Sequence, residues 1–101
     1  MTDLTLEECL KQDRGYQGRL FEVDENKLGI GEKSIHLYRV LDYKDATMNI
    51  KGYLRGRGVQ RLDNVPVDDE RKQDVVMNSK RLMDWYRMAG LAGKAGLFLE
   101  D

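Results

Sequence analysis

The segment Ser34–Leu41 constrains the fold more than any other part of this chain, because it alternates as a strand and is apolar on both sides. Its side chains divide into two faces, with Ile35, Leu37 and Leu41 on one and His36, Tyr38 and Val40 on the other. A strand that is apolar on both faces needs a covering layer on each side. We therefore expect Ser34–Leu41 to occupy a central position in a sheet.

Shorter segments on the N-terminal side of this strand also favour extended structure. From Gln17 the pattern alternates with a period of two, and Phe21 and Val23 point the same way. Residues 24–26 are typical of a turn, and Lys27–Ile30 follows as a short return strand. These segments predict antiparallel pairing with Ser34–Leu41.

Residues 45–55 fit either a helix that begins at Asp45 or a strand that places Met48, Ile50 and Leu54 on one face. We favour the strand, because Thr47 and Gly52 weaken a helix. Arg55–Gly58 is expected to form a loop, since it holds two glycines in four residues. The sheet then has three to four strands.

Two helices are expected to flank the sheet. Thr5 followed by Glu8 is typical of a capping box, so a short helix begins there and ends at Arg14-Gly15. Pro66 and the acidic residues 68–70 predict the start of a second helix, which we extend from Asp68 to about Ala89. Apolar side chains cover about half the circumference of this long helix. The expected fold is α+β, with a small antiparallel sheet, a short N-terminal helix and a long C-terminal amphipathic helix.

Residues 90–101 form a tail with a glycine at every third position from Gly90 to Gly96. This spacing disfavours a stable helix and predicts a mobile or domain-swapped tail. The chain has 101 residues, which fits a single domain over 1–101.

Composition indicates an intracellular protein. No apolar run approaches the roughly 20 residues that span a bilayer, and the first residues are acidic where a signal peptide would be basic. The single cysteine, Cys9, has no second cysteine with which to form an internal disulfide. We therefore expect the cytoplasm.

The sequence offers little to metal, cofactor or catalytic chemistry. Cys9 and the single histidine, His36, fall on separate elements, without the spacing of a metal motif. Residues 90–96 contain a lysine but lack the hydroxyl residue and the strand-to-helix setting of a nucleotide-binding loop. No nucleophile accompanies the histidine in a catalytic motif. We expect no metal, no cofactor and no enzymatic activity.

Charge is distributed unevenly along the chain. The net charge is −4 over residues 1–32, +5 over residues 33–61 and −2 over residues 62–101. Bases interleaved with tyrosines suit single-stranded nucleic acid, through phosphate neutralisation and base stacking. Nucleic-acid binding is therefore one hypothesis, and its contact residues would be Lys51, Tyr53, Arg55, Arg57 and Arg61.

The favoured hypothesis is a small regulator, adaptor or inhibitor that acts by binding a protein partner or a second copy of itself. Methionines fall beside arginines on the charged side of the long helix, a composition typical of protein contact surfaces. The apolar end of the tail either folds back onto its own sheet or adds to the edge of a neighbouring one. The expected contact residues are Met77, Arg81, Trp85, Met88, Leu97, Phe98 and Leu99.

Overall fold

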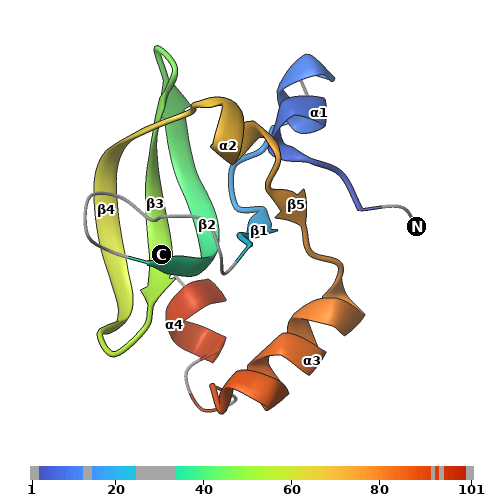
Figure 1. Ribbon diagram of the computed structural model, residues 1–101, viewed down its shortest axis with the longest axis vertical. Coiled ribbons are helices and arrows are strands. Elements are labelled where there is room, and N and C mark those ends of the chain that lie inside the picture. Colours follow the sequence, from blue (N-terminus) through green and yellow to red (C-terminus); the bar gives the residue numbers. More distant parts are fainter. Residues whose placement is uncertain (1–2, 13–14, 25–33, 92, 94, 100–101) are drawn as a thin grey trace.

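The computed structural model describes residues 3–12, 15–24, 34–91, 93 and 95–99, without the side chain of Leu99. The expected strand Lys27–Ile30 lies outside these residues. The elements (Figure 1) are, in chain order, α1 (Leu6–Lys11), β1 (Leu20–Glu22), β2 (Ile35–Lys44), β3 (Thr47–Leu54), β4 (Gly58–Pro66), α2 (Asp69–Lys72), β5 (Val75–Val76), α3 (Ser79–Ala89) and α4 (Ala95–Leu99).

The strands form one antiparallel sheet in the order β4-β3-β2-β1-β5. The central position expected for Ser34–Leu41 is confirmed, because β2 is the middle strand. The expected count of three to four strands is wrong, since the sheet has five. The missed strands are β4 and β5.

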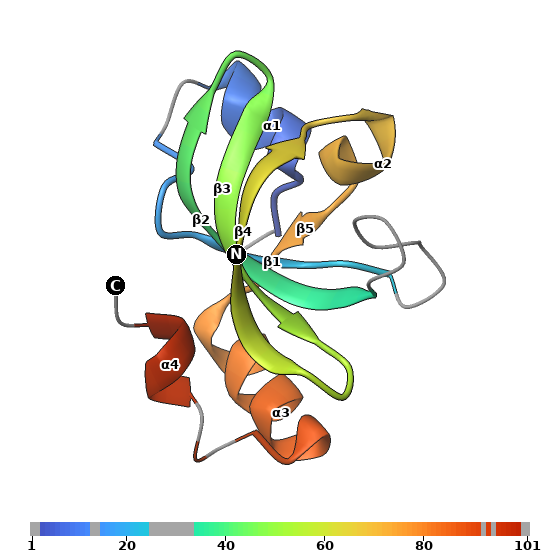
Figure 2. The ribbon, with the colours of Figure 1, turned by 90° about the vertical axis from the view of Figure 1, so that its left-hand side faces the viewer.

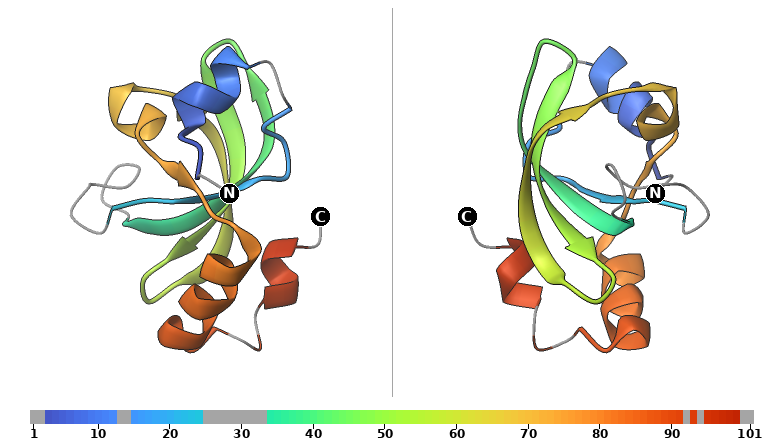
Figure 3. Two further views of the ribbon diagram at one scale, coloured as in Figure 1. Left: turned by 90° about the vertical axis from the view of Figure 1, so that its right-hand side faces the viewer. Right: turned by 60° about the vertical axis from the view of Figure 1, so that its left-hand side comes forward.

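The sheet separates two apolar clusters, which explains why β2 is apolar on both faces. One cluster joins Phe21 and Tyr38 of the sheet to Leu6 and Cys9 of α1. The other cluster joins Leu20 and Leu37, which precede Phe21 and Tyr38 on the same strands, to side chains of α3 and α4. Its buried members are Leu20, Leu37, Met77, Tyr86, Leu91 and Phe98. Figures 2 and 3 show α1 and α2 at one end of the molecule and α3 and α4 at the other.

Local signals place the start of α1 and the strand β3 as expected, although α1 ends at Lys11, before the expected Arg14-Gly15. The Thr5 hydroxyl accepts a hydrogen bond from the Glu8 amide at 3.1 Å, so the cap of α1 is confirmed. The strand interpretation of residues 45–55 is also confirmed by β3. Asp45 and Ala46 take φ values of 53° and 60°, and these two residues turn the chain tightly from β2 into β3.

The long helix expected from Asp68 to about Ala89 is wrong. Its residues instead form α2, the short strand β5 and α3. Val76 pairs with Phe21 of β1, so the chain is extended where a continuous helix would have its second turn. Asn78 then begins α3 by accepting a hydrogen bond from the Arg81 amide at 2.9 Å. The apolar spacing misled because the two valines of β5 also fit a helical face.

The expectation of a non-helical tail is also wrong, since residues 95–99 form α4. Tertiary contacts outweigh the helix-weakening glycine in this short helix. Phe98 is fully buried, and its carbonyl accepts a hydrogen bond from Arg39 Nη1 at 3.0 Å. The tail therefore packs on its own sheet. No helix of the described residues is long and apolar enough to cross a membrane.

A buried polar network joins β2 to the segment between α2 and β5. The Tyr38 hydroxyl donates to Asp74 Oδ2 at 2.7 Å, and Arg71 Nη1 lies 3.8 Å from the same oxygen. All three side chains are buried, with exposed fractions of 0% for Tyr38, 2% for Asp74 and 6% for Arg71. Buried charges need such partners, because each costs several kcal/mol when left alone. The network therefore fixes where the chain turns after α2.

Removing part of this network should destabilise the fold. We expect Tyr38→Phe to lower the free energy of unfolding by about 1–3 kcal/mol, because Asp74 loses a buried donor. Asp74→Ala should cost about 3–5 kcal/mol, because it leaves the buried Arg71 guanidinium without this carboxylate. Urea unfolding measures both changes. Tyr43→Phe, on the same strand but half-buried, is the matched control, and a loss no larger at Tyr38 than at Tyr43 would contradict the network's role.

Stability should also fall at alkaline pH because of Tyr38. Burial, followed by the neighbouring Asp74 carboxylate, raises the pKa of Tyr38 well above its usual value of 10.0. The unfolded chain therefore ionises this hydroxyl first as pH rises. The contribution of the Tyr38 hydroxyl to the free energy of unfolding is complete below about pH 10. It is lost as the pH rises from there towards the pKa of Tyr38 in the folded protein. Urea midpoints from pH 8 to 11 should fall more steeply for the wild type than for Tyr38→Phe, and parallel curves would refute this origin.

Candidate functional site

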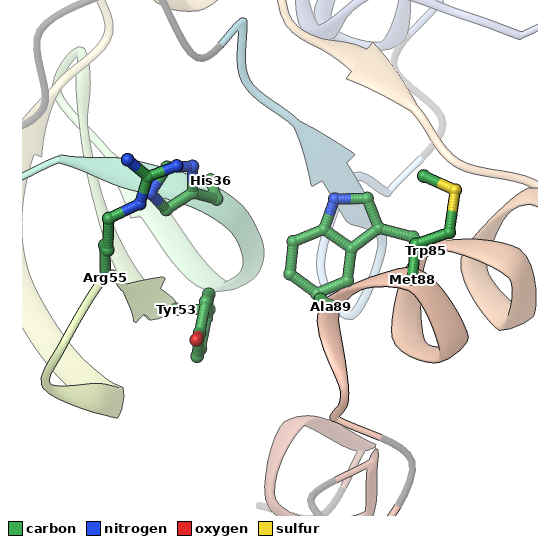
Figure 4. Close-up of a pocket in the computed structure, with 6 residues that line it drawn as sticks. All are labelled: His36, Tyr53, Arg55, Trp85, Met88 and Ala89. Carbon is green, nitrogen blue, oxygen red and sulfur yellow. The ribbon is translucent and has the colours of Figure 1, made fainter.

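A hollow of about 310 Å³ opens between the sheet and α3 (Figure 4). β2, β3 and the turn after β3 supply one side, and the C-terminal half of α3 supplies the other. The described residues that line it are His36, Tyr53, Arg55, Trp85, Met88 and Ala89.

Trp85 is fixed in the hollow by edge contacts with two other rings. Its ring centroid lies 5.7 Å from that of Tyr53 and 5.9 Å from that of Tyr86, with steep interplanar angles. Tyr86 is fully buried and in turn contacts Phe98 of α4. Such edge-to-face pairs are favourable beyond the area that they bury. The indole is thus held by packing while it reaches across the hollow towards the sheet (Figure 4).

A β-bulge brings His36 to this hollow. The pairing of β2 with β3 shifts between Ile35 and Leu37, so His36 is an extra residue in the ladder. Ile35 consequently lies in the cluster with α1, whereas Leu37 lies in the cluster with α3. The assignment of these two residues to one face is therefore wrong. The His36 ring lies 6.1 Å from the Tyr53 ring at the sheet side of the hollow.

The rim of the hollow carries positive charge. Arg55 is exposed in the turn that leads from β3 to β4, and it lines the hollow on the sheet side, as His36 does (Figure 4). Among the described residues that line the hollow, no side chain is acidic. Trp85 and Met88 supply apolar surface on the opposite side, from α3. The arrangement suits a ligand with an apolar side chain next to a negative group.

The structure divides the residues expected to contact a protein. Trp85 and Met88 line the hollow, and Met88 is 84% exposed. Leu97 is also exposed, on α4. The others are engaged within the fold or not described. Met77 and Phe98 are buried, Arg81 forms ion pairs with Asp3 and Glu22, and the Leu99 side chain lies outside the described residues.

The residues expected to contact nucleic acid are divided as well. Tyr53 and Arg55 line the hollow with Trp85, whereas Lys51 and Arg61 line a second hollow on the sheet. Arg57 is exposed in the turn between β3 and β4, and it lines neither hollow. Sequence reasoning weighed His36 only for metal and catalytic chemistry and did not place it in a binding site, because no local signal marks the bulge. It also missed Arg39, which its strand position could have placed beside Lys51.

No family model, no curated protein and no solved structure matches this chain. Across the described residues, no group of three or more His, Cys, Asp or Glu side chains is placed to share a metal ion. The two hollows are therefore the features from which we infer a function.

Proposed function

We propose that this chain is a protein-binding domain whose hollow receives an apolar side chain from an acidic segment of a partner. One observation carries the proposal: the apolar surfaces of Trp85, Tyr53 and Met88 line the same hollow as the Arg55 side chain. Tryptophan, tyrosine, methionine and arginine are the residue types enriched at the cores of protein interfaces. All four meet here.

The size and rigidity of the hollow favour a side chain over a whole small molecule. Its volume of about 310 Å³ lies at the lower end of the roughly 300–1,000 Å³ typical of small-molecule sites. Trp85 is already fixed by Tyr53 and Tyr86, so binding costs little side-chain ordering there. A partner would also cover Met88, and full burial of such a side chain contributes about 1.5–3 kcal/mol.

The charge of the site specifies the partner's chemistry. Arg55 at the rim attracts a carboxylate and repels a basic segment. Because this guanidinium is exposed, the charge acts mainly on association rate and selectivity. The apolar side chain therefore provides most of the affinity, and the acid beside it provides the specificity.

A displayed library of random linear peptides tests the proposal. Selected peptides should share an aromatic or large aliphatic residue next to Asp or Glu, and they should change the fluorescence of Trp85, the only tryptophan. Titration of that signal then gives the dissociation constant for each variant. If no peptide is selected, or if selected peptides leave Trp85 unchanged, the proposal fails.

Two matched pairs of variants locate the binding site. Met88→Ser should weaken peptide binding about tenfold or more, whereas Met83→Ser, on the same helix and 55% exposed, does not alter the hollow. Arg55→Glu should weaken binding of acidic peptides, whereas Arg57→Glu in the same turn should change it by about twofold at most. Equal effects within either pair would contradict binding at this hollow.

A further inference from the structure

A second hollow, of about 480 Å³, lies on the sheet and shares no lining residue with the first. Strands β2, β3 and β4 supply most of its lining, and residues 17 and 18 supply the rest. Its described lining residues are Gln17, Gly18, Arg39, Val40, Leu41, Asp42, Lys51 and Arg61. Three of them are cations, which sets this site apart from the aromatic hollow.

The three cations form a row across neighbouring strands. Arg39 of β2 pairs in register with Lys51 of β3, and Lys51 pairs with Arg61 of β4. Residues in register share a face, and the outer two strands lie about 9–10 Å apart. Like charges placed directly opposite one another destabilise a sheet. The fold therefore brings three positive charges side by side in this hollow, where Asp42 and the Arg61–Asp63 pair offset part of their repulsion.

Contacts within the protein hold the two ends of the row. Arg39 Nη1 donates to the Phe98 carbonyl at 3.0 Å. Its guanidinium also passes close to Gly18, where an added Cβ would lie 3.9 Å from Nη2. Arg61 Nε donates to Asp63 Oδ1 at 2.9 Å in an exposed pair, which contributes little to stability. Lys51, half-buried between them, is thus flanked by two positioned guanidinium groups.

Asp42 narrows the choice of anion. Its carboxylate also lines the hollow and accepts two hydrogen bonds from Asn49 Nδ2, each at 3.1 Å. A simple anion would be repelled by this carboxylate. A ligand that presents a hydroxyl to Asp42 and phosphate to the cations would satisfy both. A nucleotide unit, with a sugar hydroxyl next to its phosphate, has this chemistry.

We propose that the row of Arg39, Lys51 and Arg61 binds the phosphate groups of nucleotide units, with Asp42 accepting a sugar hydroxyl. The units come either from single-stranded nucleic acid or from free nucleotides, which share this chemistry. The site is independent of the protein-binding hollow, because the two have no lining residue in common.

Fluorescence anisotropy distinguishes the two sources. A labelled 20-nucleotide oligouridylate and a fluorescent nucleoside triphosphate are each titrated with the full chain at 50 and 200 mM salt. If three phosphates of a single strand contact the three cations, the logarithm of the association constant should fall with the logarithm of the salt concentration, with a slope of about −2. Tight oligonucleotide binding with that slope would identify single-stranded nucleic acid as the ligand. Binding of the triphosphate alone would identify a free nucleotide. If neither binds at 50 mM salt, the proposal is refuted.

The double variant Lys51→Gln/Arg61→Gln tests the site itself. It should weaken binding at least tenfold and reduce the salt slope for the oligonucleotide to about −0.7. The urea midpoint of the double variant should stay close to that of the wild type, because relief of the like charges offsets the loss of the exposed Arg61–Asp63 pair. Arg57→Gln, outside both hollows, is the control for general electrostatics. Equal losses in the control and the double variant would overturn the assignment.

The proposal of nucleotide binding and the proposal of protein binding can be tested separately. Met88→Ser should leave nucleotide binding unchanged, and the double variant should leave peptide binding unchanged. If Met88→Ser reduces nucleotide binding and peptide binding equally, the nucleotide does not bind at the row of Arg39, Lys51 and Arg61, and this proposal is refuted.

Discussion

The buried hydrogen bond between Tyr38 and Asp74 determines the course of the C-terminal half of the chain. Asp74 follows the C-cap of α2, and its buried side chain binds Tyr38, a member of the cluster that packs against α1. Its carbonyl also accepts a hydrogen bond from the Leu6 amide at 2.8 Å. With both its carboxylate and its carbonyl engaged, residue 74 leaves the helical path, and the chain continues as β5 beside β1.

That change of direction is what creates the aromatic hollow. Arg71 and Asp74 meet Tyr38 on one face of the sheet, whereas Tyr86 packs against Leu37 on the other face. A single straight helix cannot contact both faces of one sheet. The two-residue strand β5 carries the chain past the sheet edge, and α3 can then pack on the second face with Trp85 directed towards Tyr53.

The sequence specifies the parts of this fold that depend on local chemistry. The cap at Thr5 is a side-chain hydrogen bond within four residues, and the two-sided pattern of β2 reflects burial on both faces. Strand β4 was not recognised because it is an edge strand with polar, half-exposed side chains and no clear alternation. The division of the expected long helix depends on Asp74 meeting Tyr38, 36 positions away, and no periodicity records such a contact. The same holds for the bulge that brings His36 to the hollow.

Residues 75 and 76 are extended and separate two helices, α2 and α3. Backbone NMR measures this directly, through Cα chemical shifts over residues 69–89 and amide contacts between strands. We expect extended shifts at Val75 and Val76, helical shifts on both sides of them, and a cross-strand contact between Val76 and Phe21. Uninterrupted helical shifts from 69 to 89, with no contact to Phe21, would show that Asp74 does not interrupt the helix.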